Sequence, residues 1–239
     1  MRLKVAVCIV AGAFVASAQA ITGVHPRTGA GDYAAAQQSG KVTYAASVLS
    51  ADQVKHIFAT DISESYLVFE VACYPSQASQ MRIDADDFLI RAGKNSEFVH
   101  PADAVTVASF IQQKNTPARP SNNNSAVYTS ANVGYESGTD PYTGRRVHGV
   151  YTGAGVGVGP ADPGPPFPAP PGSAPQDRML LESQLSDKAL PQGSFSEPIA
   201  GFLYFPLKAI KKKSNGAYQM NYLGDPSGKV ALQIPAKNR

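Results

Sequence analysis

A glycine- and proline-rich stretch of sixty residues, 119–178, constrains this chain more than any other feature. It contains an asparagine run, closely spaced glycines and eight prolines between Pro160 and Pro175. The stretch has almost no bulky aliphatic side chains, so it cannot bury a core of its own. A structureless loop of this length is unusual inside a compact domain, which indicates a low-complexity insertion, placed at 119–175.

The insertion divides into two parts of different composition. Ala126–Tyr135 and Val147–Val158 flank the turn-rich segment Asp140–Gly144, a pattern that predicts a β-hairpin. The proline-rich end that follows is predicted to be extended, semi-rigid polyproline. The insertion should therefore be the most accessible part of the molecule.

The segments on either side, 41–118 and 176–235, alternate strand and turn signals. The predicted strands are Val42–Val48, Tyr66–Tyr74, Met81–Ile83, Phe88–Arg91, Ala200–Phe205, Ala217–Leu223 and Lys229–Ile234. The predicted helices run from Ser50 to Phe58, from Pro101 to Lys114 and from Met179 to Ala189. Neither half has enough apolar surface to cover both faces of its strands, so we expect one discontinuous all-β sandwich with two or three short helices.

Residues 1–20 have the three parts of a secretory signal peptide: Arg2 and Lys4, the apolar run Val5–Val15, and the small-residue site Ala18–Ala20. The alternative is a membrane anchor or buried helix, but the apolar run is too short to span ~30 Å of bilayer. We therefore expect cleavage after Ala20 and export to the periplasm or the exterior.

After cleavage, residues 21–40 are small and polar, which predicts a flexible leader. Cys73 is then the only cysteine, so no intramolecular disulfide is possible. It lies on the apolar face of the predicted strand Tyr66–Tyr74, which indicates a small hydrophobic core residue and not a reactive thiol.

Charge argues against two classes of partner. The chain has 21 Lys and Arg against 18 Asp and Glu, and removal of Arg2 and Lys4 leaves 19 against 18. A net charge near +1 is a poor basis for binding nucleic acid or an anionic membrane. No later stretch approaches eighteen apolar residues, so we expect no transmembrane segment in the mature chain.

Three sequence blocks, Tyr66–Pro75, Asp86–Arg91 and Gly201–Pro206, resemble the strand blocks of exported, uncharacterised bacterial immunoglobulin-like proteins. The stretch from Val133 through Arg146 to the Gly-Val repeat is similar to the insertion in such proteins. The resemblance covers roughly 45–235. It implies an immunoglobulin-like β-sandwich and export, and it supplies no catalytic residue.

Metal and cofactor motifs are weak, and we predict no cofactor. The four histidines are widely separated, with no HExxH pair. The acidic run containing Asp84, Asp86 and Asp87 is similar to the opening of a calcium loop, but Leu89 replaces the glycine and Asn95 the glutamate that such a loop requires. A polar strand connection is the favoured interpretation, and a surface calcium site is the alternative.

Catalytic motifs are also weak. No G-x-S-x-G elbow or Cys/His arrangement is present. Asp61 and Glu64 would serve as a general acid and base if a cleft held them together. The glycine run Gly153–Gly159 lacks phosphate-binding spacing and precedes prolines instead of a helix, so flexible or strand-like glycines explain it better.

Two segments remain as candidates for interaction. The first is a lysine tract, made of Lys208, Lys211, Lys212 and Lys213. It either guards an exposed sheet edge or contacts an anionic envelope polymer or lipid headgroup. The second lies in the proline-rich end of the insertion and is made of Pro165, Pro166, Phe167 and Pro168. It is either a spacer or a preformed extended ligand.

Two hypotheses for function follow. The first is an exported, non-enzymatic, envelope-associated binding or structural module that uses its insertion to reach an envelope protein or polymer. The second is a secreted hydrolase or carbohydrate-active enzyme. A pocket of convergent polar groups with shifted pKa values would favour the enzyme, and shallow surface would favour the module.

Overall fold

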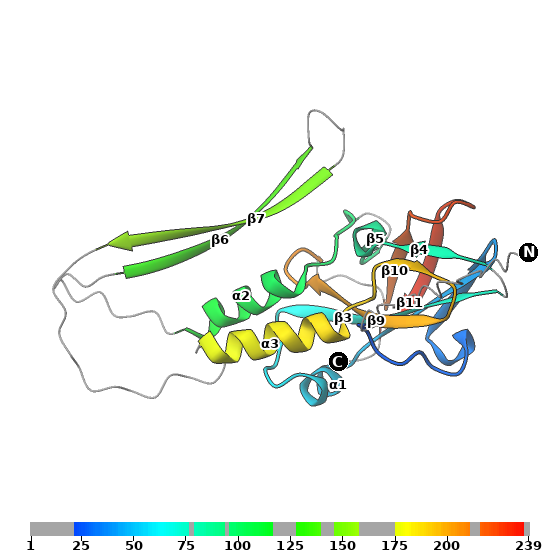
Figure 1. Ribbon diagram of the computed structural model, residues 1–239, viewed down its shortest axis with the longest axis horizontal. Helices are drawn as coiled ribbons and strands as arrows, with labels where there is room; N and C mark the ends of the chain where they lie inside the picture. The colour runs from blue at the N-terminus through cyan, green and yellow to red at the C-terminus, as the bar shows by residue number, and fades with distance from the viewer. Residues whose placement is uncertain are drawn as a thin grey trace, which may run out of the picture.

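Two larger sheets form the body of the protein (Figure 1). The computed structural model describes residues 22–76, 79–93, 96–116, 128–139, 146–157, 175–210 and 216–236. The first sheet is antiparallel, with the order β1-β2-β3-β9. Its strands are β1 (Ala35–Ser39), β2 (Val42–Val48), β3 (Tyr66–Pro75) and β9 (Ile199–Pro206). The second sheet has the order β11-β10-β5 and consists of β5 (Phe88–Arg91), β10 (Ala217–Tyr222) and β11 (Val230–Pro235).

Strands from the two sides of the insertion pair directly with one another. In the first sheet, Phe69 of β3 lies opposite Leu203 of β9. In the second sheet, Ile90 of β5 lies opposite Met220 of β10. The two sheets share one buried cluster, to which every strand from β2 through β11 of the two sheets contributes. The sheet system expected from the apolar surface of the two halves is therefore present in these pairings.

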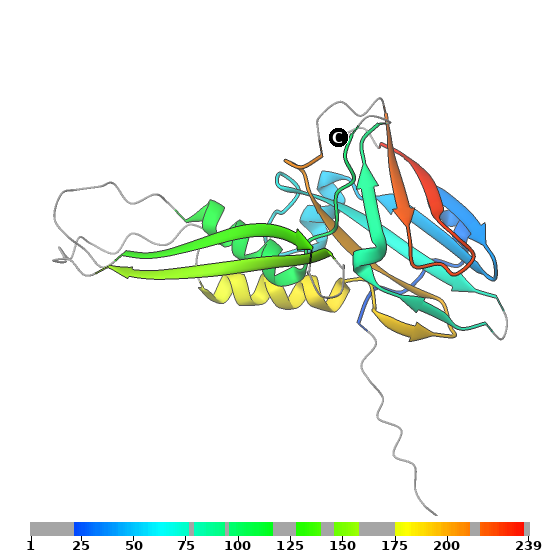
Figure 2. The ribbon, with the colours of Figure 1, turned by 90° about the horizontal axis from the view of Figure 1, so that it is seen from above.

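Three helices cover the other face of the first sheet: α1 (Ala51–Ile57), α2 (Ala104–Asn115) and α3 (Pro175–Lys188). The cap of α1 is the predicted one, since the Ser50 side chain accepts from the backbone N of Gln53 and the Gln53 side chain accepts from the backbone N of Ser50. α2 and α3 run side by side (Figures 1 and 2). α3 begins four residues earlier than predicted, at Pro175, because proline is well suited to the first turn of a helix.

β3 is buried on both faces, which explains its nearly continuous apolar sequence. Leu67 and Phe69 point into the core between the two sheets. Tyr66 and Val68 point into the cluster formed with the helices. Side chains alternate across a strand, so each face needs its own apolar set. The described residues form mostly antiparallel strands with three short helices, which confirms that part of the predicted fold class.

Two further pairs of strands complete the described structure. β4 (Met81–Ile83) pairs with β8 (Gly193–Phe195). β6 (Tyr128–Thr139) pairs antiparallel with β7 (Arg146–Gly157), at the place where the sequence predicts a hairpin. We call this pair the ribbon. Figure 1 shows it running past α2, clear of the two larger sheets. The predicted signal peptide and the predicted polyproline segment lie outside the described residues.

The prediction of a flexible leader over 21–40 is wrong for the residues that the structure describes, 22–40. Val24 forms an antiparallel bridge with Ala200 at the edge of β9. Tyr33 is buried, and β1 is the edge strand of the first sheet. This segment has little apolar content. An ion pair and hydrogen bonds to the first sheet hold it in place.

Buried tyrosines should make the fold sensitive to high pH. Burial, with a smaller effect of the negative charge of Asp103, raises the pKa of Tyr66 to about 12. The folded state favours the neutral phenol, so this stabilisation is complete below the unfolded pKa of about 10 and is lost as the pH rises from there towards 12. We expect the free energy of unfolding, measured by denaturant titration, to fall over this range. The fall should be smaller in Tyr66→Phe. An equal fall in the free energy of unfolding with pH in the variant and in the original protein would contradict the role of Tyr66.

Candidate functional site

A buried carboxylate on β3 is the centre of the main polar cluster. Glu70 follows Tyr66 and Val68 on the same face of the strand, and its side chain is only 11% exposed. A carboxylate in this position needs a cation and hydrogen-bond donors, because burial of an unpaired charge is costly. The N-terminal segment supplies both. We call the cluster of Arg27, Asp32, Tyr33, Glu70 and Tyr74 the latch.

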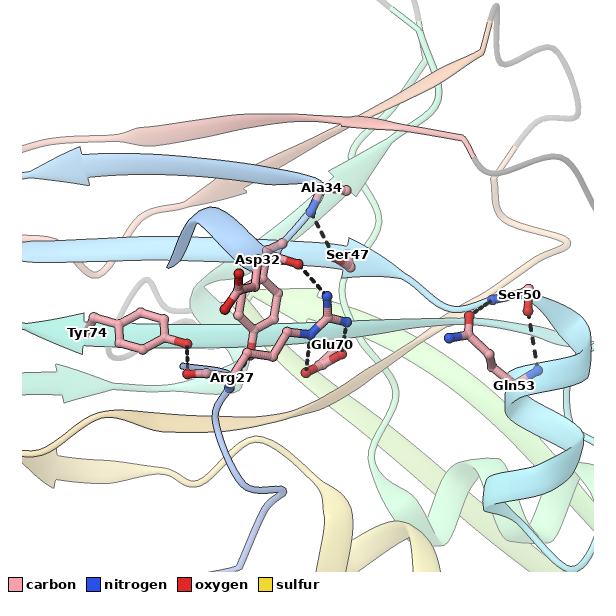
Figure 3. Close-up of polar contacts among 9 residues, drawn as sticks. Arg27, Asp32, Ala34, Ser47, Ser50, Gln53, Glu70 and Tyr74 are labelled. Carbon is pink, nitrogen blue, oxygen red and sulfur yellow. Dashed lines mark hydrogen bonds and ion pairs between the residues drawn. The ribbon is translucent and has the colours of Figure 1, made fainter. Parts of the chain in front are cut away.

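Arg27 holds Glu70 through two nitrogens (Figure 3). Its Nε donates to Oε1 of Glu70 at 3.2 Å, and its Nη2 donates to Oε2. This two-pronged geometry is the strongest form of an arginine–carboxylate pair. The hydrogen bond to Glu70 raises the pKa of Arg27 despite the opposing effect of burial. The third guanidinium nitrogen, Nη1, donates to the backbone carbonyl of Asp32.

Two tyrosines and a serine complete the attachment of this segment. The Arg27 guanidinium carbon lies 4.4 Å from the centre of the Tyr33 ring, within the range of a cation–π contact. The hydroxyl of Tyr74 donates to the carbonyl of Arg27 at 2.8 Å. The backbone N of Ala34 donates to Oγ of Ser47 at 2.8 Å, just before β1 begins (Figure 3). The latch therefore fixes residues 27–34 against the first sheet.

An open groove of about 710 Å³ lies beside the latch. One wall is the segment 22–26, and the other runs from Ser194 to Ala200. The lining is mostly apolar, with His25 and Glu197 among its polar members. The groove is broad and open, which suits contact with a partner better than enclosure of a small substrate.

A second, smaller groove of about 410 Å³ brings together the predicted acid–base pair. Asp61 and Glu64 both line it, as do Lys114 and Asp177. Nζ of Lys55 lies 3.6 Å from Oδ2 of Asp61, and Nζ of Lys114 lies 2.8 Å from Oε2 of Glu64. Both carboxylates are thus neutralised by lysines.

The ionisation of Asp61 is unfavourable for acid catalysis. Burial acts to raise the pKa of its carboxyl, but hydrogen bonds from Ser63 and the charge of Lys55 outweigh burial and lower the pKa below its ordinary value. A general acid needs the opposite shift, so that it still carries a proton near neutral pH. The smaller groove is therefore better described as a pair of surface ion pairs.

The structure describes only one of the predicted interaction residues. Lys208 is exposed after β9, and its Nζ lies 5.8 Å from the centre of the Phe110 ring. The other predicted interaction residues lie outside the described residues: Lys211, Lys212, Lys213, Pro165, Pro166, Phe167 and Pro168. Their roles stay predictions.

The candidate calcium residues lie in a turn in which one carboxylate already accepts a hydrogen bond from the backbone. Asp84 precedes a short 3-10 helix, η2 (Ala85–Asp87), and its side chain accepts from the backbone N of Asp86. In the described part of the chain, no three Asp, Glu, His or Cys side chains come together to hold a metal ion. Cys73 is fully buried, and burial raises the pKa of its thiol, so the prediction of a core residue is confirmed.

Sequence reasoning missed the latch, although the strand carried a signal. Glu70 is the only charged residue in the apolar run from Tyr66 to Cys73. A charge at an inward position of a buried strand requires a partner. That partner, Arg27, lies 43 residues away in a segment without an apolar pattern, so its identity could not be inferred from spacing.

The described helices include none with the length and apolar character needed to cross a membrane. No protein family, curated protein or solved structure was found to match the chain.

Replacing Glu70 by glutamine should loosen the latch. The amide keeps the size of the side chain but removes the charge that pairs with Arg27, which is itself about one-third exposed. We expect the free energy of unfolding to fall by about 1–2 kcal/mol and the amides of residues 27–34 to exchange faster. The matched control is Glu64→Gln, whose ion pair is largely exposed and should contribute at most about 0.5 kcal/mol. Equal effects of the two substitutions would contradict the latch.

Proposed function

We propose that the protein is an exported, non-enzymatic binding or structural module of the cell envelope, with an immunoglobulin-like sandwich as its body and the insertion as its contact with an envelope protein or polymer. The observation that carries this proposal is the ribbon. Its two twelve-residue strands run alongside α2 and stand clear of the two larger sheets (Figure 1). Long insertions with their own structure are commonly functional, and a rigid body commonly presents such segments to partners.

The grooves give less support to an enzyme. The acidic residues that share a groove, Asp61 and Glu64, are paired with lysines, and the pKa of Asp61 is lowered. The larger groove is open and mostly apolar. These features favour recognition over proton transfer.

The ends of α2 and α3 allow a clean deletion of the insertion. Asn115 at the end of α2 and Asp177 at the start of α3 line the same groove, so the two helices meet there. Replacing 117–174 with a short Gly/Ser linker would convert them into a helical hairpin. A shorter connection between the same ends costs less closure entropy. We therefore expect this protein, called the linker variant, to keep the melting temperature of the body.

Affinity capture from envelope extract tests the proposal. The mature chain and the linker variant are immobilised separately, and captured proteins and polymers are compared. We expect a partner that the mature chain retains and the linker variant loses. Capture of the same partner by both proteins would mean that the body, and not the insertion, makes the contact. Turnover of carbohydrate, ester or peptide substrates by the mature chain, abolished in Asp61→Asn, would replace the proposal with the enzyme alternative.

The lysine tract is tested in the same extract. If Lys208 and its neighbours contact an anionic polymer, capture should weaken as the salt concentration rises from low to physiological. Capture that is lost on deletion of the insertion and is insensitive to salt would exclude the tract as the contact.

A further inference from the structure

The body covers one edge of each larger sheet, β9 in the first and β5 in the second, with segments of its own chain. Along the outer edge of β9, the backbone N of Val24 donates to the carbonyl of Ala200 at 2.9 Å, and the N of Ala102 donates to the carbonyl of Tyr204 at 2.7 Å. At the edge of β5, Ile90 and Val99 exchange two backbone hydrogen bonds. Such covers prevent other strands from adding to these edges.

The ribbon is different. Among the described residues it is a sheet of two strands, so each strand has an outer edge. β6 also approaches α2, which limits access to its side of the ribbon. In the part of the chain that the structure describes, no third strand pairs with β7. Every second residue of β7 therefore presents its backbone N–H and C=O outward.

A ribbon with one open edge is an incomplete sheet. Two-stranded sheets are marginally stable in water, and a third strand or a covering layer stabilises them. β7 also contains no lysine or proline, the residues that commonly protect exposed edges. We propose that β7 pairs antiparallel with β7 of a second copy of this chain, giving a four-stranded sheet in the order β6-β7-β7-β6 and a dimer.

The sequence of β7 fits a two-fold arrangement. With Tyr151 on the axis and opposite its own copy, residue 150 of one copy lies opposite residue 152 of the other, and residue 146 lies opposite residue 156. Arg146, the only residue of β7 that is always charged, is then opposite Val156 and far from its own copy. Tyr151 and its neighbours Val150 and Thr152, all favourable in strands, occupy the centre. No like charges oppose one another. The outward N–H and C=O groups of one β7 edge would pair with the C=O and N–H groups of the other.

The test places positive charge at the proposed seam. The seam variant carries Val150→Lys and Thr152→Lys, which bring four lysines together around the axis of a dimer. The control carries Val133→Lys and Tyr135→Lys on β6. These positions lie directly opposite Thr152 and Val150, so they add the same charge to the same face of the ribbon, one strand further from the seam. Sedimentation equilibrium across a dilution series measures the mass of each protein.

We expect the mature chain and the control to sediment at twice the mass of one chain, and the seam variant and the linker variant to sediment as monomers. A monomeric mature chain, or a seam variant that remains a dimer, would overturn the proposal. So would a monomeric control, because repulsion would then not be specific to β7. A dimer that survives in the linker variant would place the interface on the body.

Discussion

Truncation of Phe69 to alanine should lower the free energy of unfolding by about 3–5 kcal/mol, the usual cost of removing a fully buried aromatic ring. Phe69 is 0% exposed and lies in the middle of β3. Its ring stands edge-on to those of Phe205 and Tyr218, with 5.6 Å between ring centres in both cases. These neighbours come from both larger sheets, so the cavity would open at the junction between the two halves of the chain.

Denaturant titration followed by circular dichroism would measure this loss. Phe98→Ala is the matched control, because it removes the same ring from a half-buried site beside Arg91 and Lys229. A partly exposed ring contributes less, so the control should lose under about 1.5 kcal/mol. Because domains are stable by only about 5–15 kcal/mol, the Phe69 variant should lose a large fraction of its stability. Equal losses would mean that Phe69 is not at the centre of the core.

The body of the fold was predictable because its strands carry clear two-residue periodicity. Val42 and Tyr44 in β2, like Val230 and Leu232 in β11, are apolar residues two positions apart, and all four face the buried cluster. Apolar side chains spaced two residues apart lie on one face of a strand, so the spacing indicates which face is buried. The buried stripes of α2 and α3 were predictable for the same reason, with the helical period instead.

β1 was missed because its sequence carries no such signal. Ala35–Ser39 contains three polar residues in five and lies at the edge of the first sheet, where most of its side chains are exposed. Its place is determined by pairing with β2 and by the latch that precedes it. The pairing with β2 is local, since Ser39 lies opposite Val42, but backbone groups make it, and the Arg27–Glu70 contact of the latch spans 43 residues. Hydrophobic periodicity gives no information about either interaction.

In the candidate site too, contacts between residues close in sequence were predictable and contacts between distant residues were not. Asp61 and Glu64 are three residues apart, so their presence in one groove could be anticipated from the sequence. Their lysine partners differ in this respect: Lys55 is close in sequence, whereas Lys114 is fifty residues from Glu64 and arrives only through the packing of α2. The chemistry of a groove depends on such partners, which is why the sequence alone left the acid–base interpretation open.

Gly201 should be as sensitive to an added methyl group as Phe69 is to truncation. It lies in β9, opposite Val71 of β3, where the chain leaving α3 crosses close to the strand. A Cβ atom at this position would lie 2.6 Å from the carbonyl oxygen of Ala189 and 2.5 Å from the backbone N of Leu190. Both are backbone atoms, so no side-chain rotation relieves the clash. The crossing segment is itself fixed, because the N of Leu190 donates to the carbonyl of Phe202 at 3.1 Å.

Gly201→Ala is therefore expected to cost about 3 kcal/mol, at the upper end of the range for overpacking, since relief of the clash requires that the bond between Leu190 and Phe202 be strained or broken. The matched control is Gly31→Ala, where an added Cβ has no atom within 4 Å. That variant should be neutral or more stable by up to about 1 kcal/mol, because alanine restricts the unfolded chain. Thermal unfolding of the two variants should thus shift in different directions or by very different amounts. Tolerance of alanine at Gly201 would show that the segment after α3 moves freely over β9, and the close crossing would then contribute nothing to holding α3 on the sheet.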